Sequence, residues 1–217
     1  MTYEYENEAL SEGFKTVCGI DEAGRGPLCG PVCAAAVILP IGCEIEGIND
    51  SKKLSEKKRE ALFDVITEKA VAYSVSMVDA KTIDEINILQ ATFKAMKNAV
   101  NNLSVKPDIA LVDGNRKPGL DIEERTIVKG DAKSISVAAA SILAKVSRDR
   151  YMREVDKKYP EYQFAKHKGY PTKLHLELLN ELPVLSCYRK TYGPVRKVLE
   201  VKNQNLCNST DSLESLL

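Results

Sequence analysis

The stretch TVCGIDEAGRGP, residues 16–27, joins an apolar run to two acidic residues and then to two glycines. Residues 16–20 have the apolar character of a short buried strand that runs into Asp21 and Glu22. Because neighbouring residues on a strand point to opposite faces, these two carboxylates share a site only where the strand ends or twists. Gly24 and Gly26 would permit such a turn. We therefore predict a strand that delivers a pair of carboxylates to the edge of a sheet.

Strand-like and helix-like segments alternate along the rest of the chain. Further strands are predicted over residues 31–39, 71–77, 109–112 and 126–128. Helices are predicted over residues 55–69, 134–158 and 171–182 and in the segment after Gly193. Another helix is predicted to begin at a capping box formed by Thr82 and Glu85. The alternation indicates an α/β fold with a helical C-terminal third. We expect a single domain over residues 1–200, including a helical region from about residue 160, and a flexible tail over residues 201–217.

The composition is that of an ordinary globular protein. Hydrophobic residues make up 44% of the chain, and its 31 basic and 31 acidic residues balance, so net charge argues neither for nor against nucleic acid. No stretch approaches the roughly 20 apolar residues of a membrane span. The acidic N-terminus lacks the apolar core of a secretory signal, so we expect a cytoplasmic protein that has no membrane partner. The six cysteines show no zinc spacing and are expected to be reduced.

Acidic residues recur where predicted strands meet glycines. Asp21 and Asp113 each lie at such a junction, and Asp131 follows a glycine after a short apolar run. Ligands of open α/β sheets gather beyond the carboxyl ends of strands, so these acids could converge with Glu22. Converging carboxylates repel one another unless a divalent cation lies between them, and two Mg²⁺ or Mn²⁺ ions could then act on a phosphodiester. The alternative is that each acid only caps a turn.

Basic and glycine-rich segments offer a second kind of site. Residues 166–171, KHKGYP, join positive charge to Tyr170, whose ring could stack on a sugar or a base. The alternative is a solvated loop whose tyrosine packs on the next helix. Residues 24–27, GRGP, lack the spacing of a Walker loop but allow backbone amides to approach a sugar or phosphate. His167 and His175 show no metal-ligand spacing.

A series of motifs runs along the chain: DEAGRGP at 21–27, NDSKKLS at 49–55, VDGN at 112–115, KGD at 129–131, SILAKV at 141–146, HKGYPT at 167–172 and GPV at 193–195. In sequence and in order, these motifs resemble those of bacterial ribonuclease HII. The resemblance implies a ribonuclease H-like fold, with a mixed central β-sheet flanked by helices and a helical C-terminal extension. It also implies an endonuclease that hydrolyses the RNA strand of RNA/DNA hybrids. The same enzyme would incise 5′ to single ribonucleotides embedded in duplex DNA, leaving 3′-hydroxyl and 5′-phosphate ends.

The resemblance also assigns roles by position. Asp21, Glu22, Asp113 and Asp131 match the family's catalytic acids, which bind divalent Mn²⁺ or Mg²⁺, with two ions in the substrate complex. Gly24, Arg25 and Gly26 match the element that senses the 2′-hydroxyl, together with the tyrosine matched by Tyr170. The candidates for further substrate contacts are Lys52, Lys53, His167, Lys168 and Arg189. The implied partners are RNA/DNA hybrid and ribonucleotide-containing duplex DNA, bound by a monomer.

Several alternatives stay open at this point. Asp149 is a second candidate for the last acid, but its two flanking arginines and helical context favour local ion pairs, so Asp131 is preferred. Cys29 stands where the family often has a small apolar residue. A non-catalytic hybrid-binding protein would gain nothing from carboxylates that face phosphates, and a P-loop-like nucleotide enzyme is disfavoured by the missing Lys-Ser/Thr. The choice between Mg²⁺ and Mn²⁺ is undecided.

Overall fold

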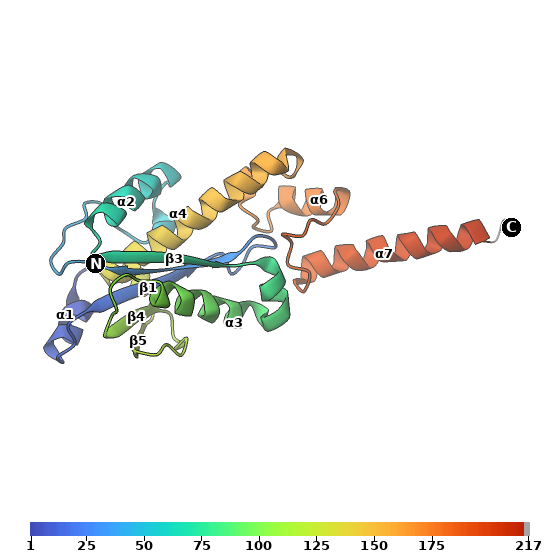
Figure 1. Ribbon diagram of the computed structural model, residues 1–217. Helices are drawn as coiled ribbons and strands as arrows, with labels where there is room; N and C mark the ends of the chain where they lie inside the picture. The colour runs from blue at the N-terminus through green and yellow to red at the C-terminus, as the bar shows by residue number, and fades with distance from the viewer. Residues whose placement is uncertain (215–217) are drawn as a thin grey trace.

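The computed structural model describes the backbone of residues 1–214 and the side chains of residues 1–51 and 53–204. Its centre is one five-stranded sheet in the order β3-β2-β1-β4-β5 (Figure 1). The strands are β1 (Val17–Ala23), β2 (Val32–Ile38), β3 (Ala72–Val78), β4 (Ile109–Asp113) and β5 (Glu123–Ile127). β2 lies antiparallel to both β1 and β3, whereas β4 lies parallel to β1 and β5. The expected mixed α/β sheet is thereby confirmed.

Helices cover both faces of this sheet. The helices are α1 (Glu4–Ser11), α2 (Glu56–Lys69), α3 (Ala80–Asn101), α4 (Ile135–Lys158), α5 (Phe164–His167), α6 (Lys173–Glu181) and α7 (Gly193–Glu214). Three short 3-10 helices join them, η1 (Ser51–Lys53), η2 (Gly130–Ala132) and η3 (Pro160–Tyr162). No helix among the described residues is long and apolar enough to cross a membrane.

Strand β2 shows why the sheet needs two helical layers. Its sequence VCAAAVI is buried at every position, so both of its faces are covered. Ala34 and Ala36 pack in the apolar cluster that includes α3 residues, whereas Ala35 packs with α4 and α2 residues. The helix α4 crosses very close to β1, since a Cβ added at Gly19 would lie 2.1 Å from the carbonyl carbon of Ser136. The small side chains of β1 and β2 therefore set the spacing of the layers.

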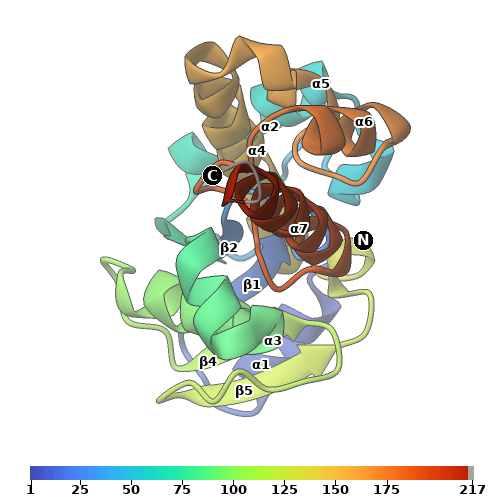
Figure 2. The same cartoon turned by 90° about the vertical axis from the view of Figure 1, so that its right-hand side faces the viewer.

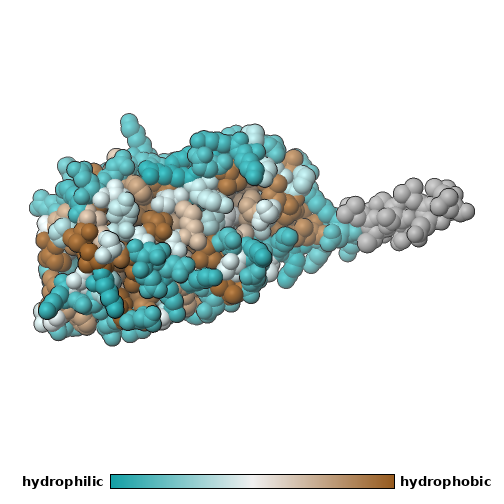
Figure 3. All heavy atoms as spheres, viewed as in Figure 1, coloured by the Kyte–Doolittle hydropathy of each residue, from teal (hydrophilic) through white to brown (hydrophobic). Residues whose placement is uncertain are grey.

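A third apolar cluster joins the end of the sheet to the C-terminal helices. Leu28 and Cys29, which follow β1, pack there with aromatic residues that include Tyr162, Phe164 and Tyr188. Figure 2 shows α5, α6 and α7 grouped at this end of the molecule. On the face seen in Figure 3, apolar residues lie scattered among hydrophilic ones. The expected helical C-terminal extension is therefore present and shares its core with the loop after β1.

The structure also corrects parts of the sequence analysis. The capping box at Thr82 and Glu85 is wrong, because α3 begins earlier and Asp79 caps it by accepting a hydrogen bond from Thr82 N at 2.8 Å. The helix α1 was not predicted, and its buried Glu6 accepts a hydrogen bond from Ser134 Oγ at 2.6 Å. The backbone of α7 continues to Glu214, so flexibility of residues 201–217 remains a prediction.

Candidate metal and nucleic-acid site

The carboxyl ends of β1 and β4 bring two of the predicted acids together. The strands are in parallel register with Ile20 opposite Val112. Asp21 and Asp113, one residue further along each strand, therefore occupy neighbouring positions on the same face of the sheet. Asp21 is only 4% exposed. Two of the four predicted acids are thus neighbours near this edge of the sheet.

The third acid reaches the same place through a backbone contact. Asp113 Oδ1 accepts hydrogen bonds from Gly130 N at 2.7 Å and from Asp131 N at 3.4 Å. These bonds join η2 to the end of β4, and Asp131 is itself buried. The short helix that carries Asp131 is thus attached to the carboxylate that ends β4.

The strand does not end at the acidic pair, contrary to the turn expected there. β1 continues to Ala23, which still pairs with Cys33 of β2. Asp21 therefore faces α4, where Ser141 donates a hydrogen bond to it. Glu22 faces the other way and borders a small cavity of about 140 Å³ that Asp113 and α3 also line. The two carboxylates leave the strand on opposite sides, as its alternation requires, but the charges of both Glu22 and Asp113 act on Asp21.

The electrostatics of Asp21 reflect this crowding of acids. Burial raises the pKa of Asp21 well above its ordinary value, and the negative charges of Glu22 and Asp113 raise it further. Hydrogen bonds from Ser141 and from Glu22 N lower it in part. A group of like charges that burial makes costly is a place where a cation would be strongly favoured.

The donor chemistry of this group suits a hard divalent ion. Carboxylate oxygens are the ligands that Mg²⁺ and Mn²⁺ prefer, with waters and substrate phosphates completing the shell. Among the described residues, no three acidic, imidazole or thiol side chains already surround one point closely enough to hold an ion unaided. The carboxylates fit a metal whose coordination is completed by side-chain adjustment, water or substrate.

The glycines after the acidic pair differ sharply in their surroundings. Gly24 has φ +95°, and a Cβ there would lie 2.1 Å from Arg148 Nε. A Cβ at Gly26 would meet only the ring of Tyr170, at 3.8 Å. Tyr170 is 38% exposed. Gly24 is therefore required by packing, whereas Gly26 keeps space open beside an accessible ring.

A cavity of about 210 Å³ brings the acidic and aromatic elements onto one wall. It is lined by Glu22, Ala23, Gly24, Arg25, Ser51, Ser141, Lys145 and Tyr170. We call it the Glu22–Tyr170 cavity. Arg25 Nη1 lies 3.2 Å from Glu22 Oε1 across its mouth, and the Arg25 side chain is half exposed.

Arg189, predicted to contact substrate, lies in the interior. It is 0% exposed. Its guanidinium donates to the carbonyl oxygens of Gly24 at 2.6 Å, Arg25 at 2.9 Å and Gly30 at 2.9 Å. This placement favours a role in holding the loop at residues 24–30, which we call the glycine loop, over a phosphate contact.

A second buried arginine holds the other end of the glycine loop. Arg148 of α4 is 0% exposed. It donates to the carbonyl oxygens of Cys29 at 3.0 Å, Pro31 at 3.0 Å and Lys168 at 2.9 Å. Sequence reasoning missed this residue, since it was noted only as a neighbour of Asp149 and nothing in its spacing marks it as buried.

His167 is likewise buried, so its predicted phosphate contact is not supported by its placement. Its Nε2 bonds Tyr162 O at 2.9 Å and its Nδ1 accepts from Gly169 N at 3.1 Å. Burial lowers the pKa of His167, which favours the neutral ring. The imidazole therefore shapes the turn that leads to Tyr170.

The predicted lysines have mixed surroundings. Lys53 is exposed at the end of η1. Lys168 is partly buried, with its Nζ 3.6 Å from Glu56 Oε1. The side chain of Lys52 lies outside the described residues. Lys53 is thus the most accessible of the described predicted cations.

Lys145 is a cavity residue that the sequence analysis did not select. Its Nζ lies 5.6 Å from the centroid of the Tyr170 ring and 2.7 Å from Asp149 Oδ1. Asp149 is also 3.9 Å from Arg59, so it makes ion pairs as predicted. Its partners are not the two flanking arginines, since Arg148 donates to backbone carbonyls and Arg150 pairs with Glu60. The i, i+4 spacing of Lys145 and Asp149 on a predicted helix was the available signal.

Residues 18–192 match the family model described as ribonuclease HII. The chain belongs to the ribonuclease HII family. A ribonuclease HII from Caldicellulosiruptor bescii is 57% identical over 203 residues, covering 93% of this chain and 94% of that protein. A crystal structure of ribonuclease H2 from Pyrococcus horikoshii aligns with a TM-score of 0.74 at 33% identity, covering 86% of this chain and 98% of that one.

A more distant structure supports the fold alone. Bst-RNase HIII in complex with Mn²⁺ aligns with a TM-score of 0.72 at 17% identity, covering 86% of this chain and 70% of that one. The ribonuclease H-like fold implied by the motifs is thereby confirmed. Membership makes this chain a hydrolase of the ribonuclease H type, a family that cleaves RNA in RNA/DNA hybrids.

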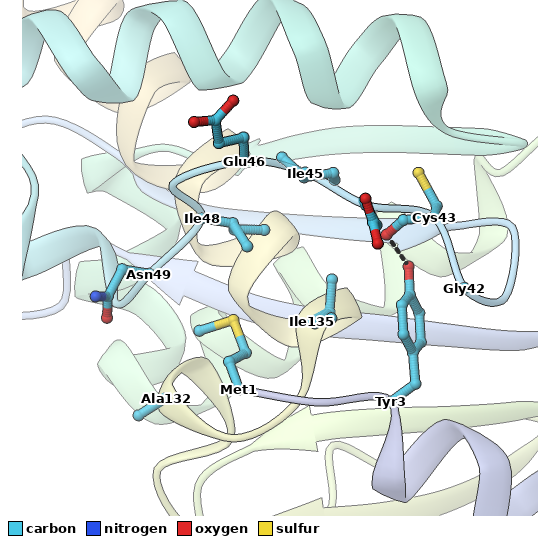
Figure 4. Close-up of a pocket in the computed structure, with 11 residues that line it drawn as sticks. Met1, Tyr3, Gly42, Cys43, Ile45, Glu46, Ile48, Asn49, Ala132 and Ile135 are labelled. Atoms are coloured by element: carbon cyan, nitrogen blue, oxygen red, sulfur yellow. Dashed lines mark hydrogen bonds between the residues drawn. The ribbon is translucent and has the colours of Figure 1, made fainter.

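A larger cavity lies beside the N-terminus and the loop that follows β2. It measures about 840 Å³, and Figure 4 shows Ile45, Ile48 and Ile135 among its lining. Tyr3 closes one side by donating a hydrogen bond to Cys43 O at 2.8 Å. Glu44 and Glu46 also line it, and their negative charge is unsuited to a phosphate backbone. The volume of this cavity is therefore no argument for a nucleic-acid site there.

Proposed function

We propose that this chain hydrolyses the RNA strand of RNA/DNA hybrids and incises 5′ to single ribonucleotides in duplex DNA. Asp21, Glu22, Asp113 and Asp131 would hold the divalent ions. One observation carries the proposal: Glu22 and Tyr170 line the same cavity, beside the gap that Gly26 leaves open. Groups suited to a metal and groups suited to a ribose thus face one space.

Different residues around this space would contact the sugar, the phosphates and the metal ions. The backbone of Gly24–Gly26 and the Tyr170 ring would enclose the 2′-hydroxyl, the group that distinguishes RNA from DNA. Lys145 and Lys53 would contact phosphates, Lys145 being oriented by Asp149. Divalent ions at the carboxylates would activate the attacking water and stabilise the leaving 3′-oxygen, giving 3′-hydroxyl and 5′-phosphate ends. Mn²⁺ is a suitable ion, as it is present in the Bst-RNase HIII structure.

The direct test compares three duplexes that differ only in their ribonucleotides: an RNA/DNA hybrid, a DNA duplex with one ribonucleotide, and an all-DNA duplex. We expect cleavage of the first two with Mg²⁺ or Mn²⁺, none of the third, and none with EDTA. Cleavage that persists in EDTA, or equal cleavage of the all-DNA duplex, would contradict the proposal.

A glycine substitution tests the sugar contact separately. Gly26→Ala places a methyl group at ordinary contact distance from Tyr170, so the fold should tolerate it. It would narrow the space for the ribose, and we expect kcat/KM on the single-ribonucleotide duplex to fall by about tenfold, as misplacement near reacting groups does. The matched control is Gly193→Ala, where an added Cβ meets nothing within 4 Å. Equal rates for the two variants would remove Gly26 from the sugar contact.

A further inference from the structure

Two cysteines meet where the glycine loop joins the C-terminal helical part. Gly30 N donates to Cys187 O at 2.8 Å, and Arg189 N donates to Leu28 O at 2.9 Å. This short antiparallel pairing places Cys29 opposite Tyr188. Cys187 directly precedes Tyr188, so the two cysteines lie on paired backbone segments, and both are free. Two cysteines far apart in the sequence are thus brought side by side.

The two thiols differ in exposure and in acidity. Cys29 is 0% exposed, whereas Cys187 is partly exposed. Burial raises the pKa of Cys29, and the hydrogen bond from Cys29 lowers the pKa of Cys187. Cys187 therefore ionises first and is within reach of a small solute, while Cys29 keeps its proton. That is the arrangement of an attacking thiolate beside a resolving thiol.

The other described cysteines lack this arrangement. Cys18 and Cys33 are fully buried in the sheet, where burial raises the pKa of each to about 12. Cys43 is partly exposed, in the loop that follows β2. The contact between Cys29 and Cys187 is therefore specific within residues 1–204, the range whose side chains, Lys52 apart, are described.

We propose that Cys29 and Cys187 are a redox modification site, oxidised reversibly to a disulfide by a hydroperoxide, and that this disulfide slows the nuclease. The Cys187 thiolate attacks one peroxide oxygen and the O–O bond breaks, giving a sulfenic acid and an alkoxide, or hydroxide where the oxidant is hydrogen peroxide. The Cys29 sulfur then attacks the Cys187 sulfur, and the S–O bond breaks. The oxygen leaves as water with the Cys29 proton. Two electrons pass from the sulfur pair to one peroxide, and a dithiol reverses the reaction by exchange.

The disulfide would act on the site through the glycine loop, a consequence that rests on the proposed function. A disulfide brings its sulfurs to about 2 Å, closer than hydrogen-bonded thiols. Cys29 has little room to move alone, because a Cβ at Gly169 would lie 2.9 Å from Cys29 O and 3.0 Å from its Sγ. Movement of Cys29 therefore displaces the residue before Tyr170. A shift of about 1 Å near reacting groups can cost roughly a hundredfold in rate, and we expect about a tenfold loss from this smaller, indirect movement.

The first experiment asks whether the bond forms, independently of nuclease activity. The reduced full-length chain is treated with hydrogen peroxide, digested without reductant and analysed by mass spectrometry. We expect a peptide pair linked through Cys29 and Cys187, lost on adding dithiothreitol. Cys43→Ser, which removes another partly exposed thiol, should still give the linked pair, whereas Cys187→Ser and Cys29→Ala should not. Absence of the linked pair from the oxidised wild type overturns the proposal.

The second experiment measures cleavage of the single-ribonucleotide duplex by the same samples. Peroxide should slow wild type and Cys43→Ser about tenfold, with recovery in dithiothreitol, and should leave Cys187→Ser unaffected. Equal loss in Cys187→Ser, or a linked pair without loss of rate, overturns the regulatory part. If the reduced wild type does not cut at all, the proposed function fails, while the linked peptide still decides the thiol site.

Discussion

The acidic end of the sheet and the pair of buried arginines beside it are two clusters of buried charge with opposite outcomes. Asp21 lies among like charges that, with burial, raise its pKa. Arg148 and Arg189 are more deeply buried, yet each guanidinium is surrounded by backbone carbonyl oxygens. The fold supplies acceptors for both arginines, whereas the hydrogen bonds donated to the acids leave the repulsion between their negative charges in place.

This difference distinguishes buried charges that stabilise the fold from buried charges that would bind a ligand. A buried ion is tolerated when fixed dipoles satisfy it, and the carbonyls of the glycine loop do this for both arginines. Grouped carboxylates gain stability from an added cation. The arginines therefore complete the fold, and the acids mark the place where a ligand from solution binds.

The largest effect should come from the acids and should fall on activity. Asp113→Asn removes a metal ligand, and several kcal/mol of transition-state stabilisation corresponds to a loss of roughly 10³-fold in single-turnover rate. The melting temperature should not fall, because repulsion with Asp21 is relieved. The control is Asp64→Asn, whose side chain is 80% exposed. Full Mg²⁺-dependent cleavage by Asp113→Asn would remove this residue from the site.

Substitution of the buried arginines should show the reverse pattern, with the larger loss in the free energy of unfolding. Arg189→Met leaves the carbonyl oxygens of Gly24, Arg25 and Gly30 without their donor, at about 3 kcal/mol in total. Urea unfolding would measure this loss of unfolding free energy. Arg196→Met is the matched control, since that side chain is 67% exposed and should change stability by less than about 0.5 kcal/mol. Equal unfolding midpoints for the two variants would contradict a stabilising role for Arg189.

Divalent ions should stabilise the protein through the acids alone. At a free Mn²⁺ concentration of 100 times its Kd, stability should rise by about 2.7 kcal/mol. Thermal melts with Mn²⁺ and with EDTA test this in wild type, in Arg196→Met and in Asp113→Asn. The gain should persist in the arginine variant and shrink in the aspartate variant. An equal gain in all three would place the ion elsewhere.

The last effect concerns His175, whose protonated form the fold disfavours. Burial, and then the nearby His167, lower the pKa of His175 to about 4. The unfolded chain, with an ordinary histidine pKa of about 6.5, binds more protons below that pH. Stability is therefore lost as pH falls from 6.5 toward 4, by at most roughly 1.4 kcal/mol per pH unit for this residue. His175→Gln should show a shallower slope in urea titrations between pH 6.5 and 5, and an unchanged slope would refute this.

Local pattern was enough for much of the fold. The apolar runs around Val17–Ala23 and Val32–Ile38 and the capping serines Ser55 and Ser134 lie within a few residues of the structures they specify. The error at α3 had a local cause, since Asp79 and Thr82 are both competent N-caps and only Asp79 is used. The helix α1 was missed because its anchor, Glu6, is satisfied by residues far along the chain.

The four candidate acids could be selected from the amino-acid sequence, because each stands at or beside the end of an apolar run or just after a glycine. Which cations face solvent depends instead on how the chain packs. Arg189 and His167 are of residue types that commonly contact phosphates, and both lie next to polar breaks in the sequence. In the fold, however, both are buried and hydrogen-bonded to backbone atoms. Lys145, unremarkable in a helix, points into the Glu22–Tyr170 cavity because Asp149 and Tyr170 lie beside it. Charge is a property of a residue, but its access to a ligand depends on what the rest of the chain packs around it.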